Sequence, residues 1–435
     1  MLKMDYLLLY IDPGTGSMLL ALLISALSVI FYFFTDIFNR LMILLSGGRG
    51  RQTGEISPMV IFSDHKRYWN VFEPICDEFE NREEDVLYLT ASPDDPVFRK
   101  EYKHVRAEYI GSGNRAFARL NTLKAKVLLS TTPNLDVFQW KRSKGVERYV
   151  HIAHAADDIT KYRMFGIDYY DSILLSGEYQ GKQVRALEKL RNLPEKDIEY
   201  VGVPYFDKMK QRLDECPRVK RDMQGKDGIT VLLAPSWGKN GILSKYGEEF
   251  IDSLAETGYR IIIRPHPQSY VAEKDLIEKL QKKYQGVQNI SWNQDNDNFE
   301  ALKNSDILIS DFSGVIFDYA LVFDKPVIYA DTDFDKSPYD CYWLDDELWT
   351  FKILPAFGKE LKQTDVKEIG RMIGDCLSDG SYEVGREQAR KDTWMHMGEG
   401  AKRTVDYLEK CISDPGKKGG KMVQTDDIQT GKNMI

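Results

Sequence analysis

Cysteine is scarce in this sequence, and its few cysteines lie far apart. They include no CxxC pair and are odd in number: Cys76, Cys216, Cys341, Cys376 and Cys411. Disulfide frameworks and structural zinc sites usually show paired cysteines at short spacing. We therefore predict reduced thiols in a reducing compartment, with neither a disulfide framework nor a cysteine-based zinc site.

An excess of basic charge is also missing. The chain of 435 residues has a formal net charge of −8 and a sequence pI near 5.5. Proteins that bind nucleic acid generally carry a basic surface for the phosphates. The charge therefore argues against a nucleic-acid partner, while the length allows two domains with a core each.

Long uncharged runs are rare, but residues 17–34 (SMLLALLISALSVIFYFF) form one. This run meets the lower length limit for a helix that spans a bilayer. A signal peptide would need a more basic start and a small-residue cleavage site after the run. Because Arg40, Arg49 and Arg51 follow it, the positive-inside rule predicts a single-pass anchor at the cell membrane with a cytoplasmic catalytic part. A re-entrant or surface-lying helix is the alternative.

Strand-like runs alternate with helical segments through the rest of the chain, which is typical of parallel sheets with crossover helices. A first series of strands is expected at 59–62, 85–89, 107–110, 126–130, 148–152, 172–176 and 198–201. A second series is expected at 229–234, 260–263, 287–290, 307–310 and 327–329, with helices at 245–257, 272–284, 298–303, 366–376 and 387–411.

This pattern predicts an α/β fold of two doubly wound, Rossmann-like domains facing a cleft. The expected parts are an anchor and basic linker over 1–57, one domain over 58–207, a second over 228–412 and a disordered tail over 413–435. In such folds, ligands bind in the crevice at the carboxyl ends of the strands.

The most informative segment is residues 307–329, a strand, loop, helix and strand in succession. Its loop combines hydroxyls, a carboxylate and a glycine: Ser310, Asp311, Phe312, Ser313 and Gly314. A helix start offers free N–H groups and the positive end of the helix dipole, which suits a phosphate. The alternative is an ordinary helix cap, because Ser and Asp are common capping residues.

Two further loops follow strands of the second series. Residues 234–239 (APSWGK) contain Ser236 and Lys239, which suit a phosphate contact, although the spacing of a P-loop is absent. Arg264 and His266 lie in an RPHP turn, where arginine can fork onto phosphate oxygens and histidine can donate or shuttle a proton. A rigid turn with exposed basic residues is the alternative reading of RPHP.

The first series contributes a histidine at a strand end. His151 lies within the expected strand and is interpreted as a packed residue, whereas His154 lies just past its end. With a carboxylate nearby, Asp157 or Asp158, such a histidine can act as general base for a hydroxyl acceptor. The two aspartates can equally cap the segment that follows.

Asp331-Thr332-Asp333 is similar to the metal-binding DxD of some sugar transferases. Acidic loop residues are usually only solvated, and we predict no metal site and no cofactor.

The RPHP turn, the SDFSG loop with Asp318, and Asp324-Lys325-Pro326-Val327 resemble the CDP-glycerol glycerophosphotransferase family of teichoic-acid primases and polymerases. The APSW loop and Gly202-Val203-Pro204 are also similar to theirs. The resemblance runs over about 150–411 and implies a GT-B fold, with the donor on the second domain and the acceptor on the first. It implies that Arg264 and His266 contact donor phosphates. Ser310, Ser313 and Gly314 would cradle the pyrophosphate, and Asp311 or Asp318 would orient the donor.

The family's base histidine usually precedes glycine, but here His154 is followed by Ala155-Ala156-Asp157-Asp158. This difference indicates a divergent branch. The reaction implied is transfer of glycerophosphate from CDP-glycerol to a hydroxyl of a lipid-linked or membrane-face acceptor, releasing CMP, with His154, His266 and Asp158 as catalytic candidates. The alternatives are a GT-B glycosyltransferase that uses a nucleotide-sugar for capsule or exopolysaccharide, and a non-catalytic, membrane-tethered binding protein.

Overall fold

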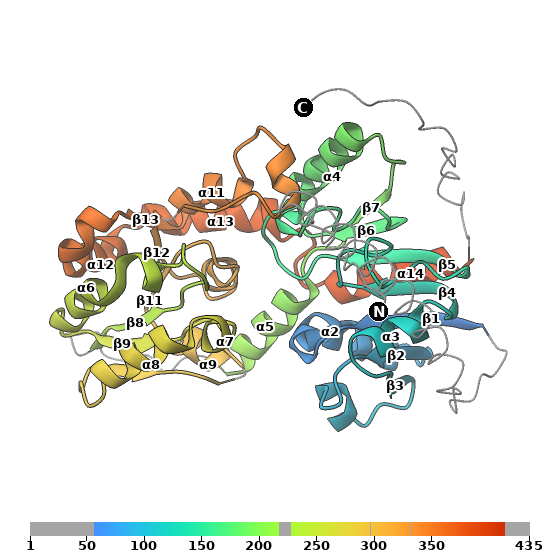
Figure 1. The fold of residues 1–435 in the computed structure, drawn as a ribbon, viewed down its shortest axis with the longest axis horizontal. Coiled ribbons are helices and arrows are strands. Elements are labelled where there is room, and N and C mark those ends of the chain that lie inside the picture. The colour runs from blue at the N-terminus through green and yellow to red at the C-terminus, as the bar shows by residue number, and fades with distance from the viewer. Residues whose placement is uncertain (1–55, 217–227, 296, 332, 414–435) are drawn as a thin grey trace, which may run out of the picture. The chain divides into compact units, whose positions relative to one another are not determined.

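The computed structural model describes residues 56–216, 228–295, 297–331 and 333–413, which form two sheets flanked by helices (Figure 1). The strand orders are β3-β2-β1-β4-β5-β6-β7 and β10-β9-β8-β11-β12-β13. Every strand pair within the two sheets is parallel. This confirms the predicted α/β class and the two doubly wound sheets. We call each sheet with its own helices the N-terminal lobe and the C-terminal lobe.

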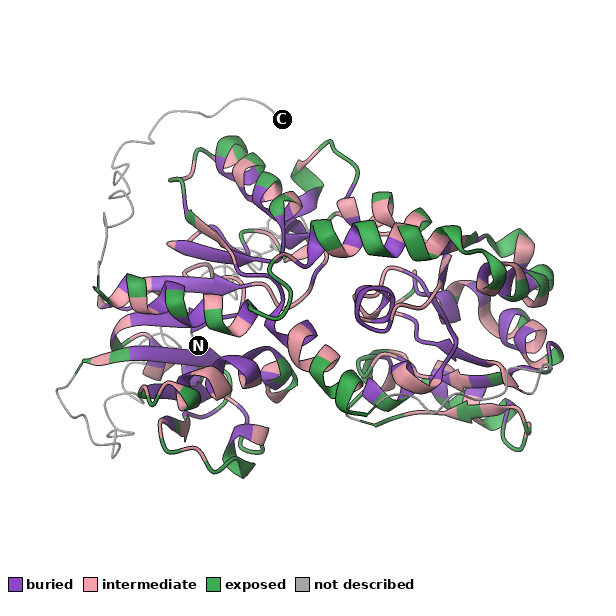
Figure 2. Ribbon diagram, turned by 180° about the vertical axis from the view of Figure 1, so that it is seen from behind, coloured by how far each residue is buried: buried purple, intermediate pink, exposed green. Residues whose placement is uncertain are grey.

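The strands of the N-terminal lobe are β1 (Ser57–Ser63), β2 (Val86–Thr90), β3 (Val105–Tyr109), β4 (Lys124–Ser130), β5 (Gly145–Ile152), β6 (Ser172–Leu175) and β7 (Asp197–Tyr200). Its helices are η1 (Lys66–Tyr68), α2 (Trp69–Asn81), η2 (Pro96–Arg99), α3 (Asn114–Leu120), η3 (Ile159–Lys161), α4 (Glu178–Arg191) and α5 (Pro204–Glu215). All seven predicted strands are present. They were recognisable because most of them are apolar runs buried on both faces, as strands of a covered parallel sheet must be (Figure 2).

The strands of the C-terminal lobe are β8 (Thr230–Leu233), β9 (Arg260–Ile263), β10 (Ile290–Trp292), β11 (Ile307–Ser310), β12 (Val327–Ala330) and β13 (Gly358–Leu361). Its helices up to β12 are α6 (Ile242–Glu256), α7 (Ser269–Ala272), α8 (Lys274–Lys283), α9 (Phe299–Asn304), α10 (Val315–Phe317) and the π-helix η5 (Asp318–Val322). Those after it are η6 (Asp340–Trp343), α11 (Trp349–Ile353), η7 (Leu354–Ala356), η8 (Gln363–Glu368), α12 (Ile369–Ser378) and α13 (Ser381–Thr393).

The prediction from the sequence did not include β13, and it placed β10 too early in the chain. The four residues of β13, GKEL, have no β-branched or aromatic side chain, so they carry little strand signal. Their register requires glycine at the start, because a Cβ on Gly358 would lie 1.7 Å from the carbonyl oxygen of Val327. Close backbone approach, rather than strand propensity, fixes this edge strand.

The predicted final helix, 387–411, is wrong because two helices occupy that region. After α13 the chain turns with positive φ at His396 and Gly398, and α14 (Gly400–Ser413) begins anew. Asp207 on α5 accepts hydrogen bonds from Trp394 Nε1 (2.8 Å) and from the backbone N–H groups of Gly398 (2.7 Å) and Gly400 (2.9 Å). The carboxylate thereby caps the start of α14.

The last helix lies against the N-terminal lobe, although the second domain was predicted to run to residue 412. α14 packs against α2, β4 and β1 of the N-terminal lobe, and Arg82 on α2 forms ion pairs with Asp406 (2.8 Å) and Glu409 (2.8 Å). Residues 400–413 therefore belong to the N-terminal lobe.

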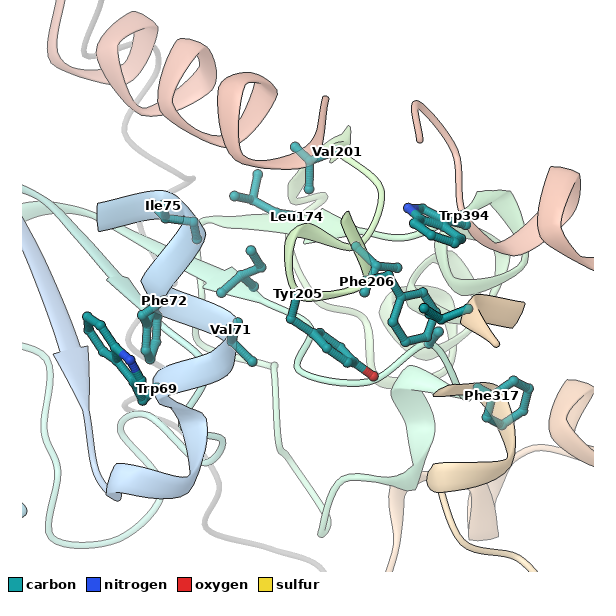
Figure 3. Packing of buried hydrophobic residues seen from close by; sticks show 14 of the residues in the cluster. Trp69, Val71, Phe72, Ile75, Leu174, Val201, Tyr205, Phe206, Phe317 and Trp394 are labelled. Atoms are coloured by element: carbon teal, nitrogen blue, oxygen red, sulfur yellow. The ribbon is translucent and has the colours of Figure 1, made fainter. Parts of the chain in front are cut away.

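One apolar cluster continues from the core of the N-terminal lobe to residues of the C-terminal lobe. Figure 3 shows α2 residues such as Phe72 near Tyr205 and Phe206 of α5, with Trp394 and Phe317 beyond them. The rings of Phe206 and Trp394 meet edge to face at 5.2 Å. The start of α5 thus packs against both ends of this cluster.

The membrane prediction concerns residues that the structure leaves undescribed. The predicted spanning helix over 17–34, most of the linker up to residue 57 and nearly all of the tail from 413 lie outside the described residues. Among the helices of the described ranges, none is both long enough and apolar enough to cross a bilayer.

Candidate functional site

Two of the predicted polar loops lie where the strand order of the C-terminal sheet reverses, and the RPHP turn and His154 follow β9 and β5, each one strand away from a reversal. In the C-terminal lobe, β8 pairs directly with β11, so loops 234–239 and 310–314 leave neighbouring strands at the same edge. In the N-terminal lobe, β1 pairs with β4, and β4 with β5, which leads to His154. In doubly wound sheets, this reversal is where ligands bind.

Ser310 and Asp311 hold the loops of the C-terminal lobe together and do not point to an open site. The Ser310 hydroxyl donates to the carbonyl oxygen of Ala234 (2.6 Å) and is fully buried. Asp311, also buried, accepts from the backbone N–H of Ser236 at Oδ1 (2.9 Å) and of Ile242 at Oδ2 (3.0 Å). Both side chains therefore have hydrogen-bond partners inside the fold, and their contact with the donor stays a prediction.

The outer part of the same loops remains free for a ligand. Ser313 and Gly314 are partly exposed just before α10, and a Cβ added at Gly314 would meet nothing within 4 Å. Lys239 is exposed, whereas the Ser236 hydroxyl is buried and its backbone N–H donates to Asp311. We therefore retain Ser313, Gly314 and Lys239 as candidates for an anion, and the phosphate contact expected of Ser236 stays a prediction.

The RPHP turn positions its two basic side chains differently. The Arg264 guanidinium donates to Asn293 Oδ1 and to the carbonyl oxygen of Asp295 (2.7 Å), so two of its donors fix the loop after β10. His266 accepts the backbone N–H of Gln268 at Nδ1 (3.1 Å). When the ring is neutral, that bond places its proton on Nε2, so His266 can offer this N–H as a donor.

His154 lies in a chain of hydrogen-bonding side chains. Its Nδ1 is 3.1 Å from the Thr131 hydroxyl and 3.0 Å from the Tyr162 hydroxyl. The same Tyr162 hydroxyl is 3.0 Å from Nε2 of His151. The prediction of a packed His151 is confirmed, since this residue is fully buried.

The surroundings of His154 keep its imidazole neutral. Burial lowers the pKa of His154 to about 4, although the nearby Asp157 carboxylate and the Thr131 carbonyl oppose that shift. The ring packs against Tyr68 with centroids 4.9 Å apart. At neutral pH, the imidazole therefore carries one proton and one lone pair.

The two aspartates after His154 have different tasks. Asp157 forms an ion pair with Lys161 (2.7 Å), and Lys161 also donates to the carbonyl oxygen of Phe312 (3.3 Å) in the C-terminal lobe. This contact brings the loop after β5 next to the loop of Ser313.

Asp158 accepts the backbone N–H groups of Trp349 (3.0 Å) and Thr350 (2.7 Å) at the start of α11. It is buried and also contacts Gln183. Asp158 therefore caps α11, the kind of role that the sequence left open as an alternative, and its catalytic role stays a prediction.

Asp318 lies where the lobes meet. The hydroxyl of Tyr205 on α5 donates to Asp318 Oδ1 (2.6 Å). Burial raises the pKa of the Asp318 carboxyl to about 6. The carboxyl group therefore changes charge close to physiological pH.

This pKa predicts a pH-dependent effect of Asp318→Asn. The unfolded carboxyl titrates near 3.8 and the folded one near 6. The protonated Asp318 carboxyl therefore contributes its full stabilisation of the wild type below about pH 4. This contribution is lost as the pH rises through 6. We expect the difference in unfolding free energy, variant minus wild type, to rise by up to about 3 kcal/mol between pH 4 and pH 7.5. Urea denaturation at the two pH values measures it. Asp345→Asn, at an exposed aspartate, is the control, and an equal difference at both pH values for Asp318→Asn would contradict the assignment.

Sequence reasoning missed Arg67, Tyr68, Lys161, Tyr162 and Tyr205. Arg67 follows β1, and its guanidinium lies 4.9 Å from the ring centroid of Tyr68. Burial, and next the positive charge of Arg67, lower the pKa of His266 in the C-terminal lobe. Polar residues that follow a parallel strand lie at the ligand-binding edge of the sheet. Applying this rule to the residues after β1 would have identified Arg67. The tyrosines carry no comparable signal.

Asp331 and Asp333 have protein partners in the C-terminal lobe. Lys245 forms an ion pair with Asp333 (2.6 Å), and the backbone of Asp331 continues the sheet by donating to Leu361. Within the described ranges, no group of three His, Cys, Asp or Glu side chains is placed to hold a metal ion.

Two surface hollows, of about 410 and 580 Å³, lie elsewhere on the chain. The first includes Trp394 and His396 after α13, and the second includes Asp77 and Lys208 between α2 and α5. Neither includes a predicted site residue, so the polar contacts described above, and not cavity size, define the candidate site.

Comparison with solved structures identifies the fold. A structure of the wall teichoic acid polymerase TagF soaked with CDPG matches with a TM-score of 0.53 at 15% identity, covering 88% of this chain and 98% of that one. S. aureus MnaA with UDP matches with a TM-score of 0.58 at 11% identity, covering 82% and 97%. A putative UDP-N-acetylglucosamine 2-epimerase from Listeria monocytogenes gives 0.54 at 12%, covering 85% and 100%. At these identities, the matches establish a GT-B-like architecture and nothing about the substrate.

Comparison of the sequences identifies the family. A search of curated proteins found no match. The family model described as CDP-Glycerol:Poly(glycerophosphate) glycerophosphotransferase matches residues 167–403, which is more than half of the chain. The match includes the RPHP turn and the loop of Ser313, and it begins after His154. The chain therefore belongs to the CDP-glycerol:poly(glycerophosphate) glycerophosphotransferase family.

Proposed function

We propose that this protein transfers glycerophosphate from CDP-glycerol to a hydroxyl group of a cell-envelope acceptor and releases CMP. The observation that carries the proposal is the meeting of the family-matched loops, 234–239 and 310–314, at the β8–β11 edge. Their open groups, Ser313, Gly314 and Lys239, are of the kind that binds a pyrophosphate.

In the reaction, the acceptor oxygen attacks the phosphorus that bears glycerol. The new P–O bond replaces the bond to the bridging oxygen, CMP leaves, and the acceptor hydroxyl loses its proton. The protein's contribution to such a transfer is mainly positioning and charge stabilisation. His266 Nε2–H and the charge of Arg67 would act on phosphate oxygens, while His154 would face the acceptor.

We also propose that residues 17–34 anchor the protein at the cell membrane, with the described lobes on the cytoplasmic side. The supporting observations are the uncharged run and the arginines that follow it. A lipid-linked acceptor and a cytoplasmic nucleotide donor would meet at that face.

The proposal predicts a donor-specific response. CDP-glycerol should raise the melting temperature of the full-length protein, and membranes that contain the protein should release CMP in the presence of a suitable acceptor. Stabilisation by uridine nucleotides alone would indicate a nucleotide-sugar transferase instead, and absence of any CMP release would indicate a non-catalytic binding protein. Activity found wholly in the soluble fraction would contradict the anchor.

His266→Ala should lower CMP release by about 100-fold, the effect typical of removing one donor to a developing phosphate or oxyanion charge. CMP release is followed at saturating CDP-glycerol. His104→Ala is the matched control, because His104 lies before β3 and its ring contacts the exposed Asp85 (3.1 Å). Equal rates for the two variants would remove His266 from the donor site.

A further inference from the structure

The Lys161 side chain reaches from the N-terminal lobe to the loop of Ser313 in the C-terminal lobe. Its ammonium group forms an ion pair with Asp157 Oδ2 (2.7 Å) and donates to the carbonyl oxygen of Phe312 (3.3 Å). Burial disfavours the charge, but the Asp157 carboxylate outweighs burial and raises the pKa of Lys161 above its ordinary value. The ammonium group is therefore charged at neutral pH.

The direction of the hydrogen bond to Phe312 is fixed by the chemistry of its two partners. An ammonium group has three N–H donors and no lone pair, and a carbonyl oxygen can only accept. A hydrogen bond from a charged donor is also roughly twice as strong as one between neutral groups. The carbonyl bond of Phe312 therefore points toward Lys161, and no other arrangement of protons satisfies the contact.

Phe312 is held on two further sides. Its ring meets the ring of Phe334 edge to face at 5.4 Å, and Lys161 Nζ lies 5.7 Å from the centroid of the same Phe334 ring. The backbone N–H of Phe312 lies beside the Asp311 carboxylate. These contacts restrict the rotation of the peptide between Phe312 and Ser313.

The orientation of this peptide decides where the N–H of Ser313 points. In a planar trans peptide, the C=O and N–H bonds point in opposite directions. Because the Phe312 carbonyl lies on the side of Lys161, the Ser313 N–H lies on the other side. Among the described residues, the N–H groups of Ser313, Gly314 and Val315 donate no backbone hydrogen bond. They are therefore available to an anion.

The opposite orientation of the peptide would not suit an anion. The Phe312 carbonyl oxygen, which carries a partial negative charge, would then face the phosphate oxygens in place of an N–H group. Turning the peptide over would also break the bond to Lys161 and leave its mostly buried ammonium group without that acceptor. The contact with Lys161 therefore favours the orientation that a phosphate requires.

We propose that Lys161 is a positioning residue that fixes the peptide between Phe312 and Ser313, so that the N–H of Ser313 faces the phosphate oxygens of the donor. The inference rests on the proposed function, which places the pyrophosphate at Ser313 and Gly314. Because Lys161 belongs to the N-terminal lobe, the donor loop has its binding shape only while the two lobes are in contact. Lys161 thus acts on the donor site without touching the donor.

This peptide can be observed without a ligand, because the chain has two Phe–Ser pairs, Phe62–Ser63 and Phe312–Ser313. When phenylalanine carries a ¹³C-carbonyl and serine carries ¹⁵N, an HNCO spectrum of the full-length protein at pH 7.5 shows these two pairs, and Ser313→Ala identifies the second. Lys161→Met should move the Phe312 carbonyl signal upfield, because its charged donor is lost. The Phe62 signal should stay in place and report that the variant is folded.

Binding of CDP-glycerol is followed at the Ser313 N–H in the same spectra. In the wild type, the donor should move this signal downfield, while the Phe312 carbonyl signal keeps its position. Lys161→Met should weaken binding by about 10- to 100-fold, the effect of losing a hydrogen bond to a charged group. Lys161→Arg should restore most of the affinity, because a guanidinium group also donates to a carbonyl and pairs with Asp157. Arg163→Met, at an exposed cation nearby, is the control and should bind as the wild type does.

Three results would overturn the proposal. The first is a Phe312 carbonyl signal that is the same in the wild type and in Lys161→Met, and the second is an unchanged affinity of Lys161→Met for CDP-glycerol. The third is a wild-type Phe312 signal that moves to the Lys161→Met position when CDP-glycerol binds, since Lys161 would then have left the peptide for the donor. Lys161→Gln, which also lacks the charge, replaces Lys161→Met if that variant does not fold.

Failure of the proposed function is distinguishable from failure of this inference. If the wild type does not bind CDP-glycerol, the proposed function fails, and the donor role of Lys161 fails with it. The ligand-free spectra still decide whether Lys161 fixes the peptide between Phe312 and Ser313.

Discussion

Asp311→Ala should lower the unfolding free energy by about 3–5 kcal/mol, because it leaves two buried backbone N–H groups without an acceptor. Those groups belong to Ser236 and to Ile242 at the first turn of α6, and each lies within 3.0 Å of one carboxylate oxygen. Asp311→Asn keeps one acceptor and should cost less, about 1–3 kcal/mol. Denaturant unfolding of the full-length protein measures both changes.

Ser313→Ala is the matched control on the same loop. Ser313 is partly exposed, and its hydroxyl makes no hydrogen bond within the described residues. Its stability should therefore change by less than about 0.5 kcal/mol. In CDP-glycerol binding the two substitutions should also differ: Asp311→Ala should weaken binding by loosening loop 234–242, and Ser313→Ala by removing one contact. If Asp311→Ala were as stable as the wild type, Asp311 would not be the residue that holds this loop.

The position of the polar loops in the C-terminal lobe was predictable because the rule that places them is local. Buried strands can be recognised in the sequence as short apolar runs. Polar residues that directly follow a parallel strand lie at the ligand-binding edge of the sheet. The roles of individual side chains were not predictable. Ser310 and Ser313 are the same residue type three positions apart, yet only the first lies beside Ala234 of the neighbouring strand end. Which hydroxyl is occupied depends on packing between β8 and β11.

The loop after β5 was harder to predict because its contacts are long-range in sequence. Asp158 caps α11, whose first residues lie 191 and 192 positions further along the chain. Lys161 reaches a carbonyl 151 positions away. Nothing in the AADD run distinguishes a cap for a distant helix from a catalytic carboxylate. Predicting such pairs requires the arrangement of both lobes.

A second large effect is expected at the ion network that joins the lobes. Arg191, at the end of α4, forms ion pairs with Asp168 (2.6 Å) and with Asp340 on η6 of the C-terminal lobe. Asp340 is fully buried and also accepts the backbone N–H groups of Phe165 (2.7 Å) and Gly166 (3.1 Å). Burial raises the pKa of both aspartates even beside the guanidinium, so their charge depends on Arg191.

Arg191→Met should therefore cost about 3–5 kcal/mol of unfolding free energy, because two buried carboxyl groups lose their counter-ion. Lys189→Met, at an exposed cation on the same helix, should cost less than about 1 kcal/mol. Because the uncompensated aspartates can take up protons, the deficit of Arg191→Met should shrink when denaturation is repeated near pH 5. A deficit that stays the same at pH 5 and 7.5 would show that lost packing of the arginine stem, rather than lost charge compensation, accounts for the effect. The network would then hold η6 to α4 by shape alone, and Arg191→Met/Asp340→Asn would be no more stable than the single variant.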